Sequence, residues 1–458
     1  MDPAILEIIY FVVMGTVLGY IAGLIPGVGN TIMILLSYPI IMDSSLLNML
    51  LYYVALISTS QFSGSVVATV FGVPGESSSM PAVAEGKKLF LRGRGNFAIS
   101  NAAMGSVLGS LMTVGFVYAL LPIAVATIKK YNSTDIQITV LIIASLSMIL
   151  FFGKSKLLNI FVFAIGTCLA LIGRHDIPWF TFLPGIIPYE MFPKLYLGLP
   201  LFPVLVSLYA FPLLLTTQKQ FKDFKMDRGY KDDSPIKEHL GEFWKNIKSA
   251  LRGGSLGCLI GFVPHLGTIL GSTMSYVWER RIGKRNKTWR PDGDIKSLVA
   301  AETANNSSIF TGIMPLLLIG IPTASSEALI LAIADANSHV LNYTTTIETN
   351  LFHYLVLGFC LTNVLALCLS WPAVKYVNLL TKIKMNTIFW TTMITLMVLV
   401  YYIGSLQFDG LYFVVVTLLL LPLGYLLRNT EPMILLIAFI LNEKIMSSAV
   451  AFYQIHFG

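Results

Sequence analysis

The chain has 458 residues, of which 55% are hydrophobic and only 12% are charged. A soluble domain carries about a quarter charged residues, so this sequence has too few polar residues to cover a water-exposed surface. The composition excludes a cytosolic enzyme, a nucleic-acid-binding domain and a secreted disulfide scaffold. The net charge of +7 is therefore expected in basic loops at a membrane surface and not on a nucleic-acid-binding face.

Long apolar runs recur along the chain, and a helix needs about 20 apolar residues to cross the hydrocarbon layer. The candidate runs are residues 11–42, 95–128, 136–153, 157–173, 195–218, 253–278, 303–326, 351–371, 385–408 and 410–427. Several are long enough for two passes or half-passes, so the sequence predicts about 10 to 12 spans. The expected fold class is an all-α polytopic membrane protein with broken or re-entrant helices. The first run has no basic segment before it, so it is interpreted as a span and not as a cleaved signal peptide.

Two segments have a soluble character. Residues 219–252 contain nine Lys or Arg and six Asp or Glu, and residues 280–290 contain six basic residues. Neither is long enough for a folded domain, so both are interpreted as cytoplasmic loops at the anionic leaflet. The four cysteines lie in apolar stretches and are interpreted as small buried side chains, and no metal site is predicted.

Two blocks of helix-breaking residues occur twice. The first block, Gly23-Leu-Ile-Pro-Gly-Val-Gly29, corresponds to Gly261-Phe-Val-Pro-His-Leu-Gly267, and the second, Gly72-Val-Pro-Gly-Glu-Ser-Ser78, to Gly320-Ile-Pro-Thr-Ala-Ser-Ser326. The offset between copies grows from 238 residues in the first block to 248 in the second, which matches the longer basic loop of the second copy. The sequence therefore predicts transmembrane repeats over residues 1–217 and 246–458, joined by a charged cytoplasmic linker over residues 218–245.

The charges differ around the two copies. After the first block, repeat one has no Lys or Arg through Asp43, whereas repeat two enters the basic segment 280–290. After the second block, repeat one has four basic residues within 87–94, whereas residues 332–350 have none. Because basic loops stay in the cytoplasm, the repeats are predicted to be inverted, although the basic residues at 129–130 and 375–384 do not follow this pattern. Inverted repeats are common in secondary transporters, which bind substrate near the midplane.

The first block interrupts a predicted span. Proline lacks an N–H group and glycine tolerates positive φ, so the break exposes backbone donors and the positive end of a helix dipole. These groups cannot face lipid, and a carboxylate would satisfy them; a proline kink with close helix packing is the alternative. The candidate substrate-binding residues here are Gly27, Gly29, Asn30 and Thr31 in repeat one and His265, Gly267 and Thr268 in repeat two.

The second block adds hydroxyl groups. Serines after a break either offer hydroxyls to a ligand or cap and join helices. The further substrate-binding candidates are Pro74, Gly75, Ser77, Ser78 and Ser79, with Pro322, Thr323, Ser325 and Ser326 in repeat two.

Three acids and two amides accompany these blocks. A carboxylate at membrane depth is costly unless it is paired, protonated or facing water, so Glu76, Glu302 and Glu327 are candidates for binding the coupling ion. For Glu76 and Glu327 the alternative is an acid at a helix start near water. The adjacent amides of Asn305 and Asn306 are expected to bind a carboxylate or to bridge backbone at a broken helix.

With these residues, the sequence resembles the large permease subunit of the tripartite tricarboxylate transporters over nearly its whole length. The resemblance is carried by residues 23–29, by Pro74-Gly75-Glu76, and by Glu302-Thr-Ala-Asn-Asn306 leading to Gly320-Ile-Pro322. It implies import of organic di- and tricarboxylates across the cytoplasmic (inner) membrane, driven by protons or Na⁺ and without another cofactor. It also implies a small membrane subunit and an extracytoplasmic solute-binding protein as partners. His265 and Thr323 stand where the family has glycine.

A duplicated membrane protein can also be an intramembrane enzyme or a channel. An intramembrane enzyme acting on a lipid-linked substrate needs a reactive constellation, whereas the six histidines are scattered along the chain. A channel repeats its filter around an axis, whereas these repeats are predicted to be inverted. The sequence therefore favours transport, with the four broken segments converging on the substrate near the midplane.

Overall fold

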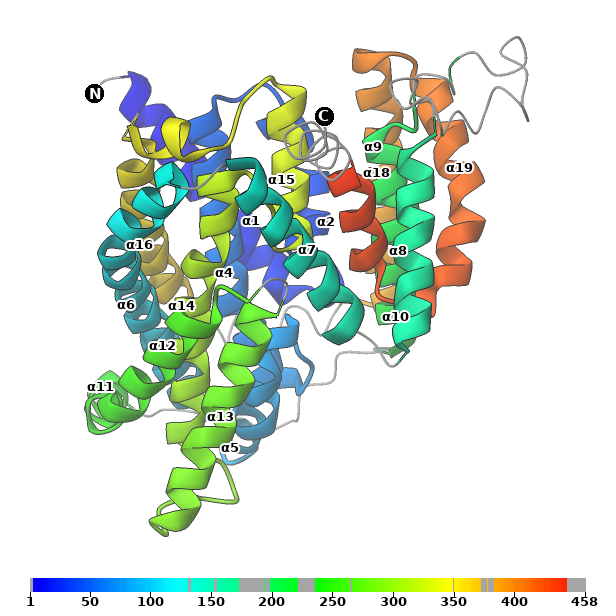
Figure 1. Cartoon of the computed structure of the whole chain (residues 1–458). Helices are drawn as coiled ribbons and strands as arrows, with labels where there is room; N and C mark the ends of the chain where they lie inside the picture. Colours follow the sequence, from blue (N-terminus) through cyan, green and yellow to red (C-terminus); the bar gives the residue numbers. More distant parts are fainter. Residues whose placement is uncertain are drawn as a thin grey trace.

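The computed structural model describes residues 3–130, 133–151, 155–172, 194, 198–220, 235–263, 266–348, 350–371, 377 and 383–442. Every element in these ranges is helical, and Figure 1 shows long helices running side by side through the molecule. Seven of them are long and apolar enough to cross a membrane. The prediction of an all-α polytopic membrane protein is therefore confirmed.

The bounds of the helices show which predicted spans are continuous. The α-helices are α1 (Pro3–Leu24), α2 (Gly29–Leu36), α3 (Tyr38–Ile41), α4 (Leu46–Phe71), α5 (Lys87–Leu91), α6 (Gly95–Lys130), α7 (Ser133–Phe151), α8 (Lys156–Ala170), α9 (Leu201–Leu205), α10 (Phe211–Gln220), α11 (Ile236–Lys245), α12 (Ile247–Ile260), α13 (Gly267–Arg285), α14 (Ile295–Ile319), α15 (Ser325–Ala336), α16 (Leu351–Leu369), α18 (Met385–Gln407) and α19 (Gly410–Leu426). Short 3₁₀ or π segments include η1 (Ser77–Ser79), η2 (Ala82–Gly86) and η4 (Val206–Ala210). Three predicted spans are divided: 11–42 between α1 and α2, 253–278 between α12 and α13, and 303–326 between α14 and α15.

The second block ends its helix in the same way in both copies. Gly72 follows α4 with φ 71°, and Gly320 follows α14 with φ 66°. Each donates its N–H to the carbonyl four residues back, Ala68 or Leu316, at 3.0 Å. Only glycine adopts this left-handed conformation without strain, so these two glycines stop the helices and free the following Pro-containing segments to turn.

Rows of glycine bring α1 against α4 and α12 against α14. A Cβ added to any of these glycines would overlap the facing helix, with Gly15, Gly19 and Gly23 facing the carbonyls of Tyr52, Leu56 and Ser60, and Gly253, Gly257 and Gly261 facing Ala300, Ala304 and Ser308. Small residues allow such close approach in membrane helices. The two helix pairs therefore pack with the same glycine spacing, and this packing occurs once in each predicted repeat.

The predicted repeats exchange one helix. α6, from the first half of the chain, packs along α14, and α16, from the second half, packs along α4. A Cβ on Gly109 of α6 would overlap the backbone of Thr303, and one on Gly358 of α16 would overlap Leu51. Residues 1–217 and 246–458 are thus interlocked around α4 and α14, both of which are buried along nearly their whole length. Residues 221–234 of the predicted linker lie outside the described ranges.

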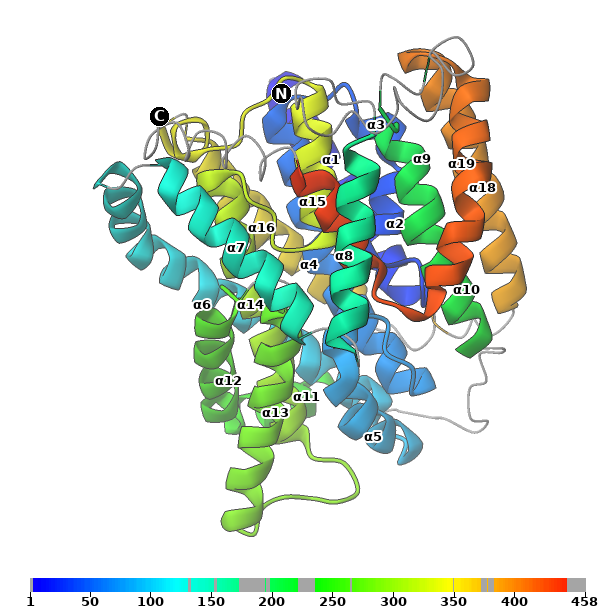
Figure 2. The same ribbon diagram turned by 45° about the vertical axis from the view of Figure 1, so that its right-hand side comes forward.

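A second group of helices stands beside this pair of central helices. It contains α8, α9, α10, α18 and α19, which Figure 2 shows running together on one side of the molecule. Asp409 begins α19 by accepting hydrogen bonds from the N–H groups of Leu411 and Tyr412, at 2.9 and 3.2 Å. Lys194 contacts the same carboxyl group and lowers its pKa, so this end of the α18–α19 hairpin is fixed by a charge pair.

The loops of the two halves meet at opposite ends of the molecule. At one end, an ion pair joins Arg92 to Asp292 (2.5 Å), and Glu85 accepts hydrogen bonds from Tyr276 Oη (2.9 Å) and Asp294 N (3.0 Å). At the other end, the side chain of Asn337 donates to the carbonyl of Met42. Figure 1 accordingly shows α5 and the end of α13 at the bottom and the end of α15 at the top.

These contacts generate a topology prediction. In a variant that lacks the four native cysteines, a single cysteine at Asp43 is expected to react with an impermeant maleimide from outside the cell. Cysteines at Arg94 and Lys284 are expected to react only in inside-out vesicles, because basic loops remain in the cytoplasm. Labelling of positions 43 and 94 from the same side would contradict the inverted arrangement.

The glycine rows generate a stability prediction. Gly19→Leu and Gly257→Leu are expected to lower the free energy of unfolding by about 1–3 kcal/mol, because each side chain would push two packed helices apart. Gly115→Leu in α6 is the control, since a Cβ there meets nothing within 4 Å. Unfolding of the purified proteins in detergent measures the difference, and equal loss in all three variants would contradict it.

Candidate functional site

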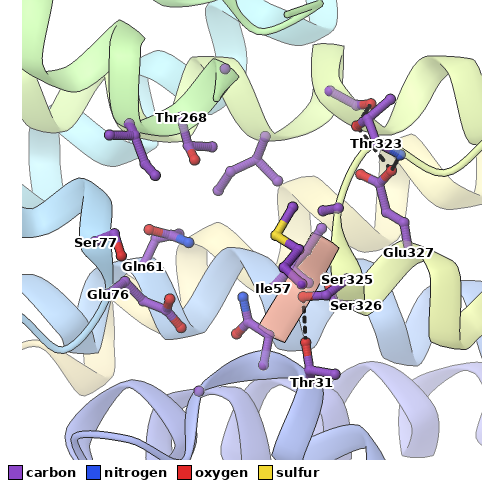
Figure 3. A pocket seen from close by; sticks show the side chains of 18 of the residues that line it. Thr31, Ile57, Gln61, Glu76, Ser77, Thr268, Thr323, Ser325, Ser326 and Glu327 are labelled. Carbon is purple, nitrogen blue, oxygen red and sulfur yellow. Dashed lines mark hydrogen bonds between the residues drawn. The ribbon is translucent and has the colours of Figure 1, made fainter. Parts of the chain in front are cut away.

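The broken helices surround a cavity of about 440 Å³, which is in the size range of small-molecule sites. Its wall includes Gly27, Gly29, Asn30, Thr31, Pro74, Gly75, Ser77, Gly267, Thr268, Thr323, Ser325 and Ser326 from the predicted binding set, and Glu76 and Glu327 from the predicted coupling set. Figure 3 shows residues from both halves of the chain facing each other across this space. The structure thus brings all four broken segments to one place.

Six predicted residues do not line the cavity, namely Ser78, Ser79, Glu302, Asn305, Asn306 and Pro322. Ser79 donates to the backbone carbonyl of Glu76 (2.7 Å), and Glu302 accepts a hydrogen bond from Ser65 Oγ (2.6 Å). Ser79 and Glu302 lie behind the wall because their side chains bond to other parts of the protein and not to the cavity. His265 lies outside the described residues.

Three helices begin at the cavity, and none of them is capped by the residue that precedes it. The residues before α2, α13 and α15 are Val28, Leu266 and Ala324, and none of them makes a capping hydrogen bond. The N–H groups of a first helical turn have no partner within the helix. The starts of these helices therefore offer backbone donors and positive dipole ends at the cavity, as an anion requires.

Hydroxyl groups join the starts of α2 and α15. Thr31 Oγ1 lies 3.0 Å from Ser325 Oγ, and Tyr209 Oη lies within hydrogen-bond distance of both, at 3.3 and 3.1 Å. Tyr53 Oη lies 3.1 Å from Ser326 Oγ. Figure 3 marks the bond between Thr31 and Ser325 at the edge of the cavity, so helix starts from the two halves are held together there.

The acidic residues at the wall differ in their bonding. Glu327 accepts hydrogen bonds from the N–H and the hydroxyl of Thr323 and so caps the start of α15. Glu76, in contrast, has a buried Oε1 atom without a partner in the described part of the chain, and the same holds for Asn30 Oδ1. Glu431 also lines the cavity, whereas no Lys or Arg is found among the described lining residues. Of Glu76 and Glu327, Glu76 is thus the one that keeps an unpartnered carboxylate oxygen.

Sequence reasoning missed six polar residues of the wall: Tyr53, Gln61, Tyr209, Thr217, Ser308 and Glu431. They come from helices or segments outside the repeated blocks. Gln61 carried a usable signal, because it lies in the apolar stretch of α4, which the predicted spans left out although it is long enough to cross a membrane. An amide at that depth is costly unless it has a partner. The other five gave no comparable signal, because hydroxyl-bearing side chains are common in membrane helices and Glu431 follows a predicted span.

Known proteins resemble this chain over nearly its whole length. Residues 9–437 match the model of the tripartite tricarboxylate transporter TctA family. An uncharacterized 52.8 kDa protein in the TAR-I ttuC' 3' region of Agrobacterium vitis is 26% identical over 94% of this chain and 84% of its own length. An uncharacterized protein of Methanocaldococcus jannaschii is 22% identical over 91% of this chain and 92% of its own. No solved structure matches the chain significantly.

Proposed function

Because the chain belongs to the tripartite tricarboxylate transporter TctA family, we propose that it is a secondary active permease that imports organic di- and tricarboxylates. Family membership favours transport over the intramembrane enzyme and the channel considered from the sequence. We place it in the cytoplasmic membrane, with a small membrane subunit and an extracytoplasmic solute-binding protein that delivers the substrate.

The observation that carries this proposal is the chemistry of the cavity. Uncapped helix starts and hydroxyl groups favour an anion, whereas three glutamates and the lack of Lys and Arg at the described wall oppose one. A di- or tricarboxylate enters such a site only when a proton or a cation enters with it. Coupling to a proton or Na⁺ gradient follows from this balance of charge.

Glu76 is the proposed site of the coupling ion. Its buried Oε1 atom has no hydrogen-bond partner in the described part of the chain. The same holds for the side-chain oxygen of Asn30, which also lines the wall. A proton would neutralise the carboxylate, whereas Na⁺ would be bound by both oxygens. Glu327 has its hydrogen bonds within the α15 cap and is proposed to serve the helix start, and Glu302 lies behind the wall.

We further propose that the two repeats are inverted and that the protein alternates between two related conformations. The equal glycine spacing of α1 on α4 and α12 on α14 supports a duplication. The loop after the second block of repeat one contacts the loop after the first block of repeat two, through Arg92 and Asp292. The loop after the first block of repeat one contacts the loop after the second block of repeat two, through Met42 and Asn337. Both contacts support opposite orientations of the two repeats. Inverted repeats allow two related conformations that open to opposite sides.

Transport assays test the function directly. Proteoliposomes that contain the protein, alone and with its copurifying partners, are expected to accumulate radiolabelled citrate or a related acid only under an inward pH or Na⁺ gradient. Uptake that only equilibrates the acid, independent of either gradient, would contradict active transport. Failure of every di- and tricarboxylate to enter under either gradient would contradict the substrate class.

Glu76 and Glu327 provide a matched pair of variants. Glu76→Gln is expected to reduce uptake and to alter its dependence on pH or Na⁺, because the carboxylate that binds the ion is lost. Glu327→Gln is expected to keep that dependence and to destabilise the protein by about 0.5–2 kcal/mol through a weaker helix cap. Uptake and thermal unfolding of both variants distinguish the roles, and an unchanged gradient dependence in Glu76→Gln would remove Glu76 from coupling.

A further inference from the structure

A glutamine on α4 faces the cavity in a fixed orientation. Gln61 lies at the cavity wall, and its Oε1 atom accepts two hydrogen bonds. One comes from Ser78 Oγ at 2.6 Å, and the other comes from Asn305 Nδ2 at 3.1 Å. Ser78 and Asn305 are almost fully buried, with exposed fractions of 2% and 0%. A carbonyl oxygen has two lone pairs, so the acceptor end of Gln61 is fully occupied.

The other end of this amide is its nitrogen. An amide Nε2 carries two N–H donors and accepts nothing. Among the described residues, none accepts a hydrogen bond from Gln61 Nε2. Figure 3 shows Gln61 at the wall, beside Ser77 and Glu76. The donors of Gln61 are therefore the ones left for a ligand in the cavity.

We propose that Gln61 is a substrate-binding residue that donates its amide N–H groups to a carboxylate of the organic acid, an inference that rests on the proposed function. Ser78 and Asn305 are positioning residues, because they hold the amide with its nitrogen toward the cavity. Both were predicted to bind substrate directly. Their side chains reach the cavity only through Gln61.

A second contact one helical turn away supports this arrangement. Ser65, four residues after Gln61 on α4, donates to Glu302, which precedes Asn305 by one turn of α14. Residues at this spacing share a helix face, so α4 and α14 are bonded at two successive levels. The side chains of Glu302 and Asn305 thus bind α4, the helix that carries Gln61. This explains why both side chains lie behind the wall.

The amide is supplied by only one of the two halves. At the 248-residue offset of the second block, the position equivalent to Gln61 is Ile309, which also lines the cavity. An isoleucine cannot donate a hydrogen bond. The site is therefore asymmetric, and a di- or tricarboxylate is held in one orientation, with one carboxylate at Gln61 and another at the helix starts.

Uptake kinetics test the proposal. Gln61→Leu and the isosteric Gln61→Glu are expected to raise the half-saturation concentration about 10- to 100-fold, the loss expected for a hydrogen bond to a charged group. Gln61→Glu replaces a donor with a repelling carboxylate, so its effect is expected to equal or exceed that of Gln61→Leu. Gln407→Leu, which makes the same change in a glutamine of α18 outside the cavity wall, is the control and is expected to leave the half-saturation concentration unchanged.

The positioning residues require a coupled measurement. Ser78→Ala is expected to raise the half-saturation concentration, Ser78→Thr is expected to restore it, and Ser78→Ala is expected to add nothing in a Gln61→Leu background, because both changes remove the same interaction. A merely structural role of Ser78 would give additive effects. Melting temperatures of all variants are measured in parallel.

The outcomes separate the inference from the function. If the wild-type protein accumulates a carboxylate and Gln61→Glu does so with the same half-saturation concentration, the inference is wrong and the function stands. Additive effects of Ser78→Ala and Gln61→Leu would overturn the positioning role. If the wild-type protein accumulates no carboxylate under any gradient, the proposed function fails first and the inference fails with it.

Discussion

Every backbone N–H group within a bilayer must find a partner inside the protein, because lipid offers none. This constraint explains why the interruptions of the apolar runs converge. The starts of α2 and α13 have no side-chain cap, and the start of α15 is capped only by its own Glu327, so any one of them alone would be unfavourable against lipid. Because these helix starts surround one cavity, water or a ligand in the cavity can accept hydrogen bonds from their N–H groups. The proposed substrate site is thus also the place where the fold satisfies its broken helices.

The features shared by the two halves form the framework, and the residues that differ between them line the cavity. The helix-ending glycines and the glycine rows are equivalent in the two halves. The residues at the cavity are not: Glu76 corresponds to Ala324, Ser79 to Glu327 and Gln61 to Ile309. Only Glu76 among these leaves a carboxylate oxygen unpartnered in the described site. A symmetric frame therefore surrounds an asymmetric site, which suits a ligand that has no symmetry of its own.

Spacing and composition predicted the breaks but not the rotation of the helices. Gly72 and Gly320 end their helices where the sequence places a glycine before a proline, because local conformation decides this. Asn305 and Glu302 were predicted at the cavity and lie behind it, since α14 is buried on all sides and no polar face indicates its orientation. Gln61 was missed because its partners, Ser78 and Asn305, come from other segments that only the tertiary fold brings together.

The exchange of α6 and α16 between the two halves has a consequence for biogenesis. α4 is inserted early in synthesis, yet α16, its packing partner, is made about 300 residues later, or tens of seconds at ribosomal rates. Until then, polar groups such as Gln61 and Asn48, which are buried in the final structure, have to be shielded by water, by α1 or by an insertion factor. The first half of the chain therefore lacks one of its packing partners until the second half has been made.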